Sequence, residues 1–176
     1  MSNEKETNPA AGLKEYPYAE AVEGAKEYFG GDDLAATVWV SKYALKDSFG
    51  KIYEKSPEQM HWRIANEIAR VEGKYPNPMD ASEVYHLLKD FKYVIPQGGP
   101  MTGIGNNLQI ASLSNCFVIG HKNPADSYGG IIRIDEEQVQ LMKRRGGVGH
   151  DLSHIRPTGS PVLNSALTST GIVPFM

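Results

Sequence analysis

The sequence of 176 residues contains a single cysteine, Cys116. One cysteine excludes a disulfide within the chain and any CxxC motif for metal binding or redox chemistry. Its thiol could still donate electrons or form a disulfide with a cysteine that lies elsewhere. The structural alternative is a buried cysteine that acts as a small apolar side chain, and the residues alone leave both roles open.

The sequence also lacks long apolar runs and an excess of charge of one sign. No stretch of about 18 consecutive apolar residues occurs, and Met1–Glu6 is not a basic region leading into an apolar one. We therefore expect no membrane segment and a cytoplasmic protein. Eighteen Lys and Arg against 21 Asp and Glu give a net charge of −3, so we expect no nucleic-acid partner, and any anion site must be local.

The first half of the chain is predicted to be helical. Residues 1–30 are polar and broken by prolines and glycines, which predicts a flexible N-terminal lead. The first helix is expected over Leu34–Asp47, where apolar residues fall near one helical face.

Two further helices have stronger end signals. Ser56-Pro57-Glu58-Gln59 predicts an N-cap, a proline at the first helical position and a capping-box Gln, with Gly73 as the stop. Asp80 and Glu83 predict another capped helix, which should run to about Lys92.

The second half changes character after Tyr93. Prolines and glycines crowd into a predicted loop over 96–105, and Phe117-Val118-Ile119 then predicts a short buried parallel strand. Asp126 or Ser127 could cap a helix that ends at Gly146-Gly147, with a possible restart near Asp135. Together with a segment around Val148, these elements indicate one βαβ unit of a parallel sheet or barrel.

A basic, glycine-rich stretch follows that helix. Lys143-Arg144-Arg145-Gly146-Gly147-Val148-Gly149, with Arg156 nearby, could bind phosphate, or it could be a basic helix end closed by a glycine cap. The same region holds His150 and His154, but the surrounding glycines and Pro157 argue against a helix that turns both toward one metal. We predict no metal site.

Several segments, taken in order, resemble the large catalytic subunit of ribonucleotide reductase. The resemblance runs from about residue 33 to the end of the sequence and implies an α+β fragment. A flexible lead at 1–30 and a helical region at 31–108 would precede the first strands and helix of a ten-stranded α/β barrel at 109–176. The motifs that carry it are Ala44-Leu45-Lys46-Asp47, Ser56-Pro57-Glu58, Val94-Ile95-Pro96-Gln97-Gly98, Ser114-Asn115-Cys116-Phe117-Val118-Ile119, Asp126-Ser127, Gly146-Gly147-Val148-Gly149, Ile155-Arg156-Pro157-Thr158-Gly159-Ser160-Pro161 and Gly171-Ile172-Val173-Pro174-Phe175.

The resemblance also implies roles at a substrate site. Cys116 resembles the first of two cysteines that reduce the 2′ carbon of a ribonucleotide and become a disulfide in each turnover. Asn115 and the backbone of Gly147 resemble positions that line the substrate. The family usually has Ser or Thr where this chain has Gly98-Gly99-Pro100, and Thr102 is the candidate substitute.

The resemblance implies an allosteric site as well. Asp126 and Ser127 resemble the pair that holds the deoxynucleoside of a dNTP or ATP effector, and Arg156 the cation near its phosphates. In the family this site lies at a homodimer interface, so the helix from about Ser127 to Arg145 would pack against its counterpart.

Other parts that the family needs do not occur in the 176 residues. These are the radical cysteine, the second reducing cysteine, the Asn and Glu that work with them, and the second phosphate loop. Reduction would therefore need a complementing C-terminal chain, a thioredoxin-like reductant, and a radical from adenosylcobalamin or from a separate metal-bearing subunit. The alternative is a stand-alone nucleotide-binding or dimerisation module without catalysis. With an unfinished barrel, the chain alone is expected to expose apolar surface and to be marginally stable or to associate.

Overall fold

The computed structural model describes residues 10, 12–120 and 126–175. The chain divides into two compact units, one up to Leu113 and one from Ser114 onward, which are described separately. The predictions that rest on residues 1–9, including the absence of a leader, lie outside the described residues.

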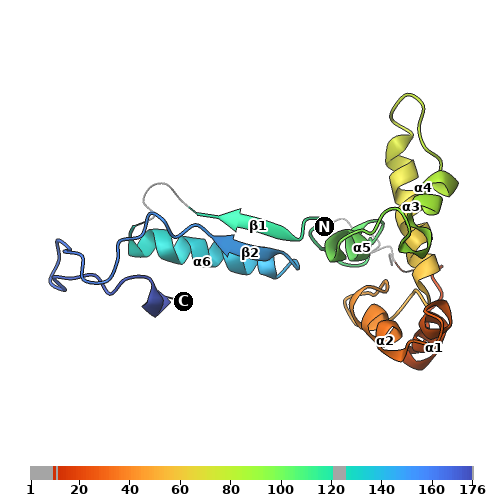
Figure 1. Cartoon of the computed structure of the whole chain (residues 1–176), viewed down its shortest axis with the longest axis horizontal. Coiled ribbons are helices and arrows are strands. Elements are labelled where there is room, and N and C mark those ends of the chain that lie inside the picture. The colour runs from red at the N-terminus through yellow and green to blue at the C-terminus, as the bar shows by residue number, and fades with distance from the viewer. Residues whose placement is uncertain (1–9, 11, 121–125, 176) are drawn as a thin grey trace, which may run out of the picture. The chain divides into compact units, whose positions relative to one another are not determined.

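The first unit is helical (Figure 1). Helix α1 packs along α2, and α3 packs along α4. The core contains Trp39 and Val40 of α2, Met60 and Ile64 of α3, and Leu88 of α4. The helices are α1 (Tyr18–Tyr28), α2 (Asp33–Lys42), α3 (Pro57–Glu72), α4 (Ala81–Leu88), the 3₁₀ turn η1 (Lys89–Phe91) and α5 (Gly98–Gly103).

Within the predicted flexible lead 1–30, helix α1 corrects the prediction over Tyr18–Tyr28. Its inward face is made of Ala21 and Ala25, which are fully buried and lie one helical turn apart. Small side chains give a weak hydrophobic signal, yet they allow close approach of the backbone. At Gly24, between them, an added Cβ would lie 2.7 Å from the carbonyl oxygen of Lys55.

The predicted helix ends are confirmed in part. Asp32 caps α2 by accepting a 2.9 Å hydrogen bond from the Ala35 amide, but α2 ends at Lys42 rather than Asp47. The chain beyond it turns to form an antiparallel bridge between Lys46 and Ile52 instead.

Helices α3 and α4 differ in how they begin. Helix α3 starts at Pro57 and stops before Gly73 as predicted, but Ser56 makes no side-chain cap. Gln59 accepts a 2.7 Å hydrogen bond from the Lys55 amide, one residue earlier than a capping box requires. The reciprocal box of Asp80 and Glu83 is present in α4. This helix ends at Leu88, and η1 carries the chain on to Phe91.

A buried ion pair joins α3 to the segment before it. Arg63 Nε donates to Glu54 Oε1 at 2.7 Å, and both side chains are at least nine-tenths buried. The guanidinium also donates to the carbonyls of Met101 and Ile104, and Glu54 accepts from the amide of Leu45. The charges are thus buried with hydrogen-bond partners, which is the condition under which burial is tolerated.

The glycine-rich segment after Pro96 was predicted to be a loop, but it forms α5 over Gly98–Gly103. The hydroxyl of Thr102 donates to the carbonyl oxygens of Gly98 and Gly99. Thr102 is 7% exposed, and its hydroxyl is engaged with the backbone of its own helix.

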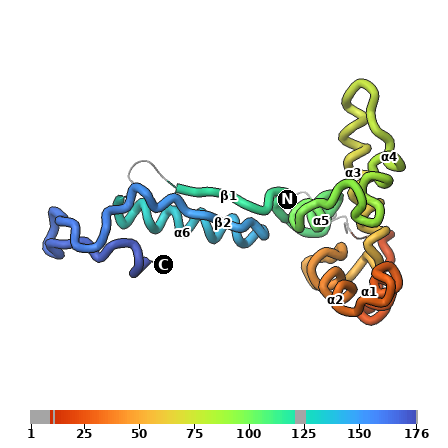
Figure 2. Tube along the Cα trace, viewed as in Figure 1, coloured from red at the N-terminus to blue at the C-terminus, as the bar shows by residue number. Residues whose placement is uncertain are grey.

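The second unit is one parallel βαβ motif, as predicted. Strand β1 (Cys116–Ile119) pairs in parallel with β2 (Gly147–His150), and α6 (Tyr128–Met142) connects them. Figure 2 shows α6 running alongside the two strands. The helix is continuous through Asp135, so the suggested restart there is wrong. A 3₁₀ turn, η2 (Val173–Phe175), lies near the end of the described residues.

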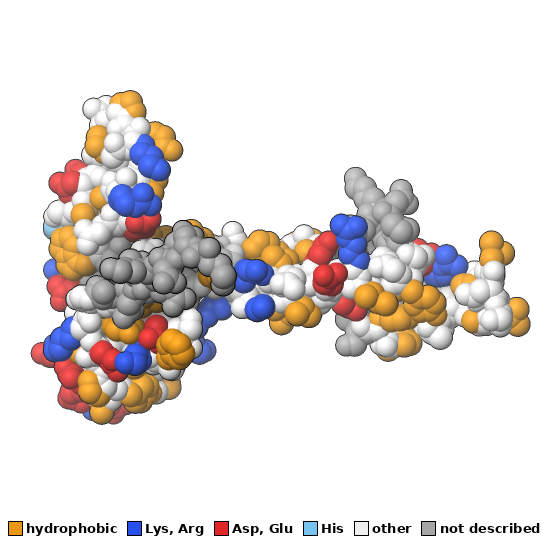
Figure 3. Space-filling model, turned by 180° about the vertical axis from the view of Figure 1, so that it is seen from behind, with side chains coloured by type: hydrophobic (Ala, Val, Ile, Leu, Met, Phe, Trp, Pro, Cys, Tyr) orange, Lys and Arg blue, Asp and Glu red, His pale blue; other side chains and the backbone are white. Residues whose placement is uncertain are grey.

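Burial of β1 was predicted but is not found. Val118 is 83% exposed, and Cys116 is exposed as well. Large hydrophobic side chains lie on the surface of both units (Figure 3). The apolar run therefore has the composition of a covered strand, but among the described residues of the second unit none covers its outer face.

The C-terminal end of α6 is capped by a residue other than glycine. Arg145 adopts φ 68°, in the left-handed region, and the amide of Gly146 donates to the carbonyl of Leu141 at 3.0 Å. Gly146 has another role, because an added Cβ there would lie 2.8 Å from Cε2 of Phe117. The expectation of a glycine cap is thus corrected to an arginine in the cap position.

Candidate active and effector sites

Parallel pairing brings together the three residues predicted to meet substrate. The register places Cys116 opposite Gly147. The amide of Gly147 donates to the carbonyl oxygen of Asn115 at 2.6 Å. The residues are distant in sequence, and the α6 crossover makes them neighbours.

The Cys116 thiol is free and exposed at the start of β1. This exposure contradicts the alternative of a buried apolar cysteine. A thiol must be accessible to reduce a substrate or to exchange with another thiol. Position and accessibility at Cys116 therefore permit redox chemistry.

Gly147 is exposed beside the thiol. An added Cβ would lie 3.2 Å from the Asn115 carbonyl oxygen, tighter than an ordinary contact. Part of the requirement for glycine thus comes from the strand pairing itself. The close approach of a substrate to this backbone stays a prediction.

The residues predicted to bind an effector also converge. Arg156 Nε donates to Asp126 Oδ2 at 2.6 Å, and the Arg156 amide donates to Asp126 Oδ1 at 3.2 Å. Ser127 caps α6, since its Oγ accepts from the Gly130 amide at 3.0 Å. All three line one hollow of about 330 Å³, which is closed on its other side by parts of segment 162–171.

The Asp126–Arg156 pair holds the acid in its charged form. Partial burial by itself raises the pKa of Asp126, but the hydrogen bonds and the charge of Arg156 outweigh it, so this pKa lies below its ordinary value. The pair is partly exposed, and so an anionic ligand could still reach the guanidinium.

The far wall of this hollow is a hairpin-like loop. The amide of Gly159 donates to the Ser169 carbonyl, and the amide of Ser169 donates to the Ser160 carbonyl, both at 2.8 Å. Arg156 Nη1 donates to the Pro161 carbonyl at 3.2 Å. The arginine therefore fastens the loop to the beginning of α6.

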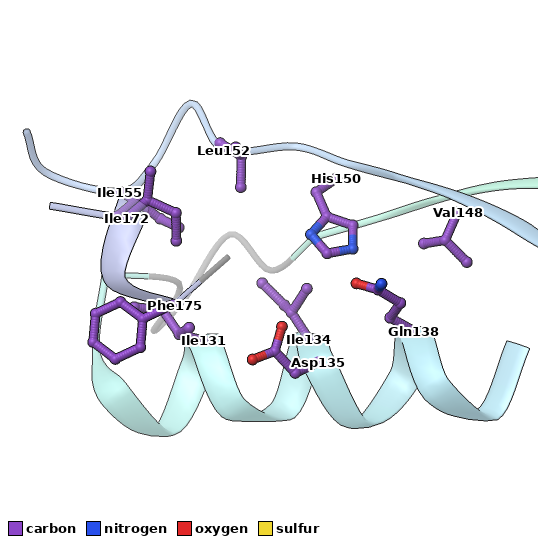
Figure 4. Close-up of a pocket in the computed structure, with 10 residues that line it drawn as sticks. All are labelled: Ile131, Ile134, Asp135, Gln138, Val148, His150, Leu152, Ile155, Ile172 and Phe175. Carbon is purple, nitrogen blue, oxygen red and sulfur yellow. The ribbon is translucent and has the colours of Figure 1, made fainter. Parts of the chain in front are cut away.

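A second hollow lies between α6 and β2, and sequence reasoning missed it (Figure 4). Its volume is about 480 Å³. Its walls are mainly aliphatic, with three polar side chains: Asp135 and Gln138 from α6 and His150 from β2. The alternation of Val148 and His150 in β2 was the available signal, because both side chains face the helix.

The remaining features considered in the sequence are the basic stretch, a metal site and a membrane segment. Arg144 Nη1 donates to the Gln140 carbonyl at 2.8 Å, which supports the helix-end interpretation of the basic stretch. Within the described residues, no group of three or more His, Cys, Asp or Glu side chains is placed to hold a metal ion. Over the same part of the chain, the helices are too short or too polar to cross a membrane.

Comparison with known proteins gives two family matches. Residues 29–99 match the ribonucleotide reductase all-alpha domain, and residues 114–176 match the ribonucleotide reductase barrel domain. These two regions correspond to the helical unit and to the βαβ unit.

Individual relatives agree with these matches. The chain is 31% identical over 157 residues to the ribonucleoside-diphosphate reductase large chain of Neurospora crassa, covering 85% of this chain and 14% of that one. It is 30% identical over 153 residues to the large subunit of Arabidopsis thaliana, covering 85% and 16%. It is 28% identical over 119 residues to subunit alpha of Chlamydia pneumoniae, covering 67% and 11%.

The chain thus spans less than a fifth of the length of these three relatives. The motifs, the helical unit and the parallel βαβ unit all agree with the two domain matches. The chain belongs to the ribonucleotide reductase large-subunit family and carries its all-alpha region and the beginning of its barrel.

Proposed function

We propose that this chain takes part in the reduction of ribonucleotides to deoxyribonucleotides, with Cys116 as one of two reducing cysteines. The observation that carries the proposal is the exposed Cys116 thiol opposite Gly147 in the parallel pair of strands. Asn115 and Gly147 would position the ribonucleotide beside the sulfur. The cytoplasmic location predicted from the sequence is part of this proposal.

The chemistry needs a second thiol from outside these 176 residues. Two thiols together supply two electrons and two protons, the 2′-hydroxyl leaves as water, and the sulfurs join in a disulfide. A complementing chain would bring the second cysteine and the radical cysteine, and a thioredoxin-like protein would reduce the disulfide. The radical would come from adenosylcobalamin or from a separate metal-bearing subunit.

We further propose that Asp126, Ser127 and Arg156 read a nucleotide effector. Their shared hollow has a guanidinium for phosphates and polar side chains at a helix N-terminus. The hollow adjoins a stripe on one face of α6 that exposes four apolar side chains, Tyr128, Ile132, Val139 and Met142, and also carries Asp135.

This stripe supports a homodimer in which α6 packs against its counterpart. Ile132→Asp should lower self-association measured by light scattering, because it places a charge in the apolar contact. Leu34→Asp is the matched control, since Leu34 is also exposed but lies on α2 of the helical unit. Equal association of both variants and the parent chain would exclude this face as the interface.

Complementation tests the catalytic proposal. The chain is mixed with a second polypeptide that carries the remaining barrel of a family member, and deoxynucleotide formation is measured. Activity that depends on both chains and is lost with Cys116→Ser supports the proposal. Nucleotide binding without any restored reduction would favour the stand-alone module, for which the effector hollow is the supporting observation.

A further inference from the structure

One titratable side chain of the helical unit is buried without a polar partner. His61, on α3, is 0% exposed, and neither ring nitrogen has a hydrogen-bond partner. The ring packs edge-to-face against Phe91 with centroids 4.7 Å apart, and against Tyr28 at 6.4 Å. In this state the imidazole serves as an apolar packing group, and a proton on it would be a buried charge without a hydrogen bond.

The element packed on this ring is strained. Asp90 and Phe91 of η1 have φ values of 56° and 54°, so two successive residues with side chains adopt the left-handed conformation, which is costly without glycine. Side-chain contacts of the turn include Phe91 against the His61 ring and the Tyr28 hydroxyl, which donates to Asp90 Oδ1 at 3.3 Å. Leu88, just before the turn, is buried in the core, whereas Lys92–Ile95 after it are exposed.

Four ionisable groups, from α3 itself and from elements packed on it, are linked to His61. Tyr28 of α1 packs against the ring, the charges of Glu58 of α3 and Asp90 of η1 act on it, and the Tyr85 hydroxyl of α4 donates to Glu58. Burial raises the pKa of Tyr28 to about 12, with Asp90 adding to the effect, and burial likewise raises the pKa of Tyr85. The two tyrosines therefore stay neutral near pH 6, while both carboxylates lie where they would attract a cation.

We propose that His61 is a proton-controlled latch on the turn Lys89–Phe91. The neutral ring holds Phe91 and keeps the strained turn closed. Protonation gives the ring a second N–H donor, and the pocket has no acceptor for either donor. The carboxylate of Asp90, on the turn itself, is a charge that acts on the ring. The turn then opens, which frees the exposed segment Lys92–Ile95 that leads to α5.

The direction of the effect follows from burial. Burial lowers the pKa of His61, and the charges of Asp90 and Glu58 only partly offset it. The closed turn takes up a proton less readily than the open one. It is therefore most stable above the ordinary histidine range and loses stability as the pH falls through that range toward the lowered value.

Hydrogen exchange of the full chain between pH 7.5 and 5 tests the latch, with protection factors corrected for the intrinsic pH dependence. We expect the amides of Lys92 and Val94, which donate to Lys89 and Leu87, to lose about tenfold in protection for each unit by which the pKa is lowered. Amides of α2 serve as the internal reference and should keep their protection. Parallel loss in α2 and in the turn would mean global unfolding and would overturn the proposal.

Two variants sharpen the test. His61→Phe keeps an aromatic ring against Phe91 but cannot take up a proton, so protection of the turn should no longer depend on pH. Asp90→Asn retains an oxygen for the Tyr28 hydroxyl but removes a charge that partly offsets burial, so the pKa of His61 in the closed turn falls further and the loss of protection at low pH should become larger. An unchanged pH profile of protection in either variant would contradict the latch. If a variant fails to fold, the test is the parent chain, in which the loss of protection in the turn is compared with that in α2.

Discussion

The proposed function depends mostly on single residues, above all on Cys116. For this residue the sequence predicted the role but not the exposure. Its identity and the surrounding motif predicted a redox role. Its exposure could not be predicted, because the apolar run that follows predicts burial. The structure places the thiol in reach of solvent because none of the residues described in the second unit covers the outer face of β1.

The Cys116 thiol should accordingly react in the native chain. We expect one equivalent of a maleimide reagent to label it at a rate close to that in denaturant. Cys116→Ser should leave the free energy of unfolding within about 0.5 kcal/mol of the parent, as for other surface substitutions. Labelling that occurs only after unfolding would contradict the exposed position.

Arg145 supplies a second residue-scale test. Because it is left-handed at φ 68°, Arg145→Gly should relieve about 1 kcal/mol of strain, partly offset by the greater freedom of glycine in the unfolded chain. Thermal unfolding should show a net gain of about 0.5 kcal/mol. Arg145→Ala removes the same charge but retains the strain, and an equal gain there would assign the effect to charge.

At the scale of elements, local signals predicted helices well where capping residues mark the end. The box of Asp80 and Glu83 is observed as expected, and so is the stop of α3 at Gly73. Helix α1 was missed because its buried face consists of alanines, whose hydrophobic signal is weak. The short helix α5 was missed because glycine and proline ordinarily indicate a loop.

Close packing of β1 on the segment before β2 gives an element-scale prediction. Gly146→Ala places a methyl group 2.8 Å from the Phe117 ring, so we expect the second unit to lose about 1–3 kcal/mol of stability, the usual cost of overpacking. Gly129→Ala in α6 is the matched control, because a Cβ there meets nothing within 4 Å. It should be neutral or gain up to about 1 kcal/mol from helix propensity.

The stability of the loop that Arg156 ties to the beginning of α6 should depend on pH. Since the pKa of Asp126 is lowered in the folded chain, the pair stabilises the loop above the ordinary Asp range. That contribution is lost as the pH falls through the lowered value. Protection of the Arg156 amide, which donates to Asp126, should drop over that window, and Asp126→Asn should remove the dependence. A pH-independent amide in the parent chain would refute the role of this pair.

At the scale of the whole molecule, the family and both domain types could be recognised from ordered motifs. The meeting of Cys116 with Gly147 depends on strand register, which arises from a crossover and not from local propensity. The exposed outer faces of β1 and α6 also belong to this scale, because their apolar side chains find no cover within the described part of the second unit. The α6 face is the surface on which a second copy is proposed to pack.

The most direct measurement of the central claim is the redox state of Cys116 after turnover in the complemented enzyme. The two chains are given ribonucleotide without an external reductant, unreacted thiols are blocked, and disulfide-linked peptides are identified by mass spectrometry. We predict a disulfide between Cys116 and a cysteine of the complementing chain, formed only when deoxynucleotide is produced. Deoxynucleotide formation while Cys116 remains a free thiol would contradict it.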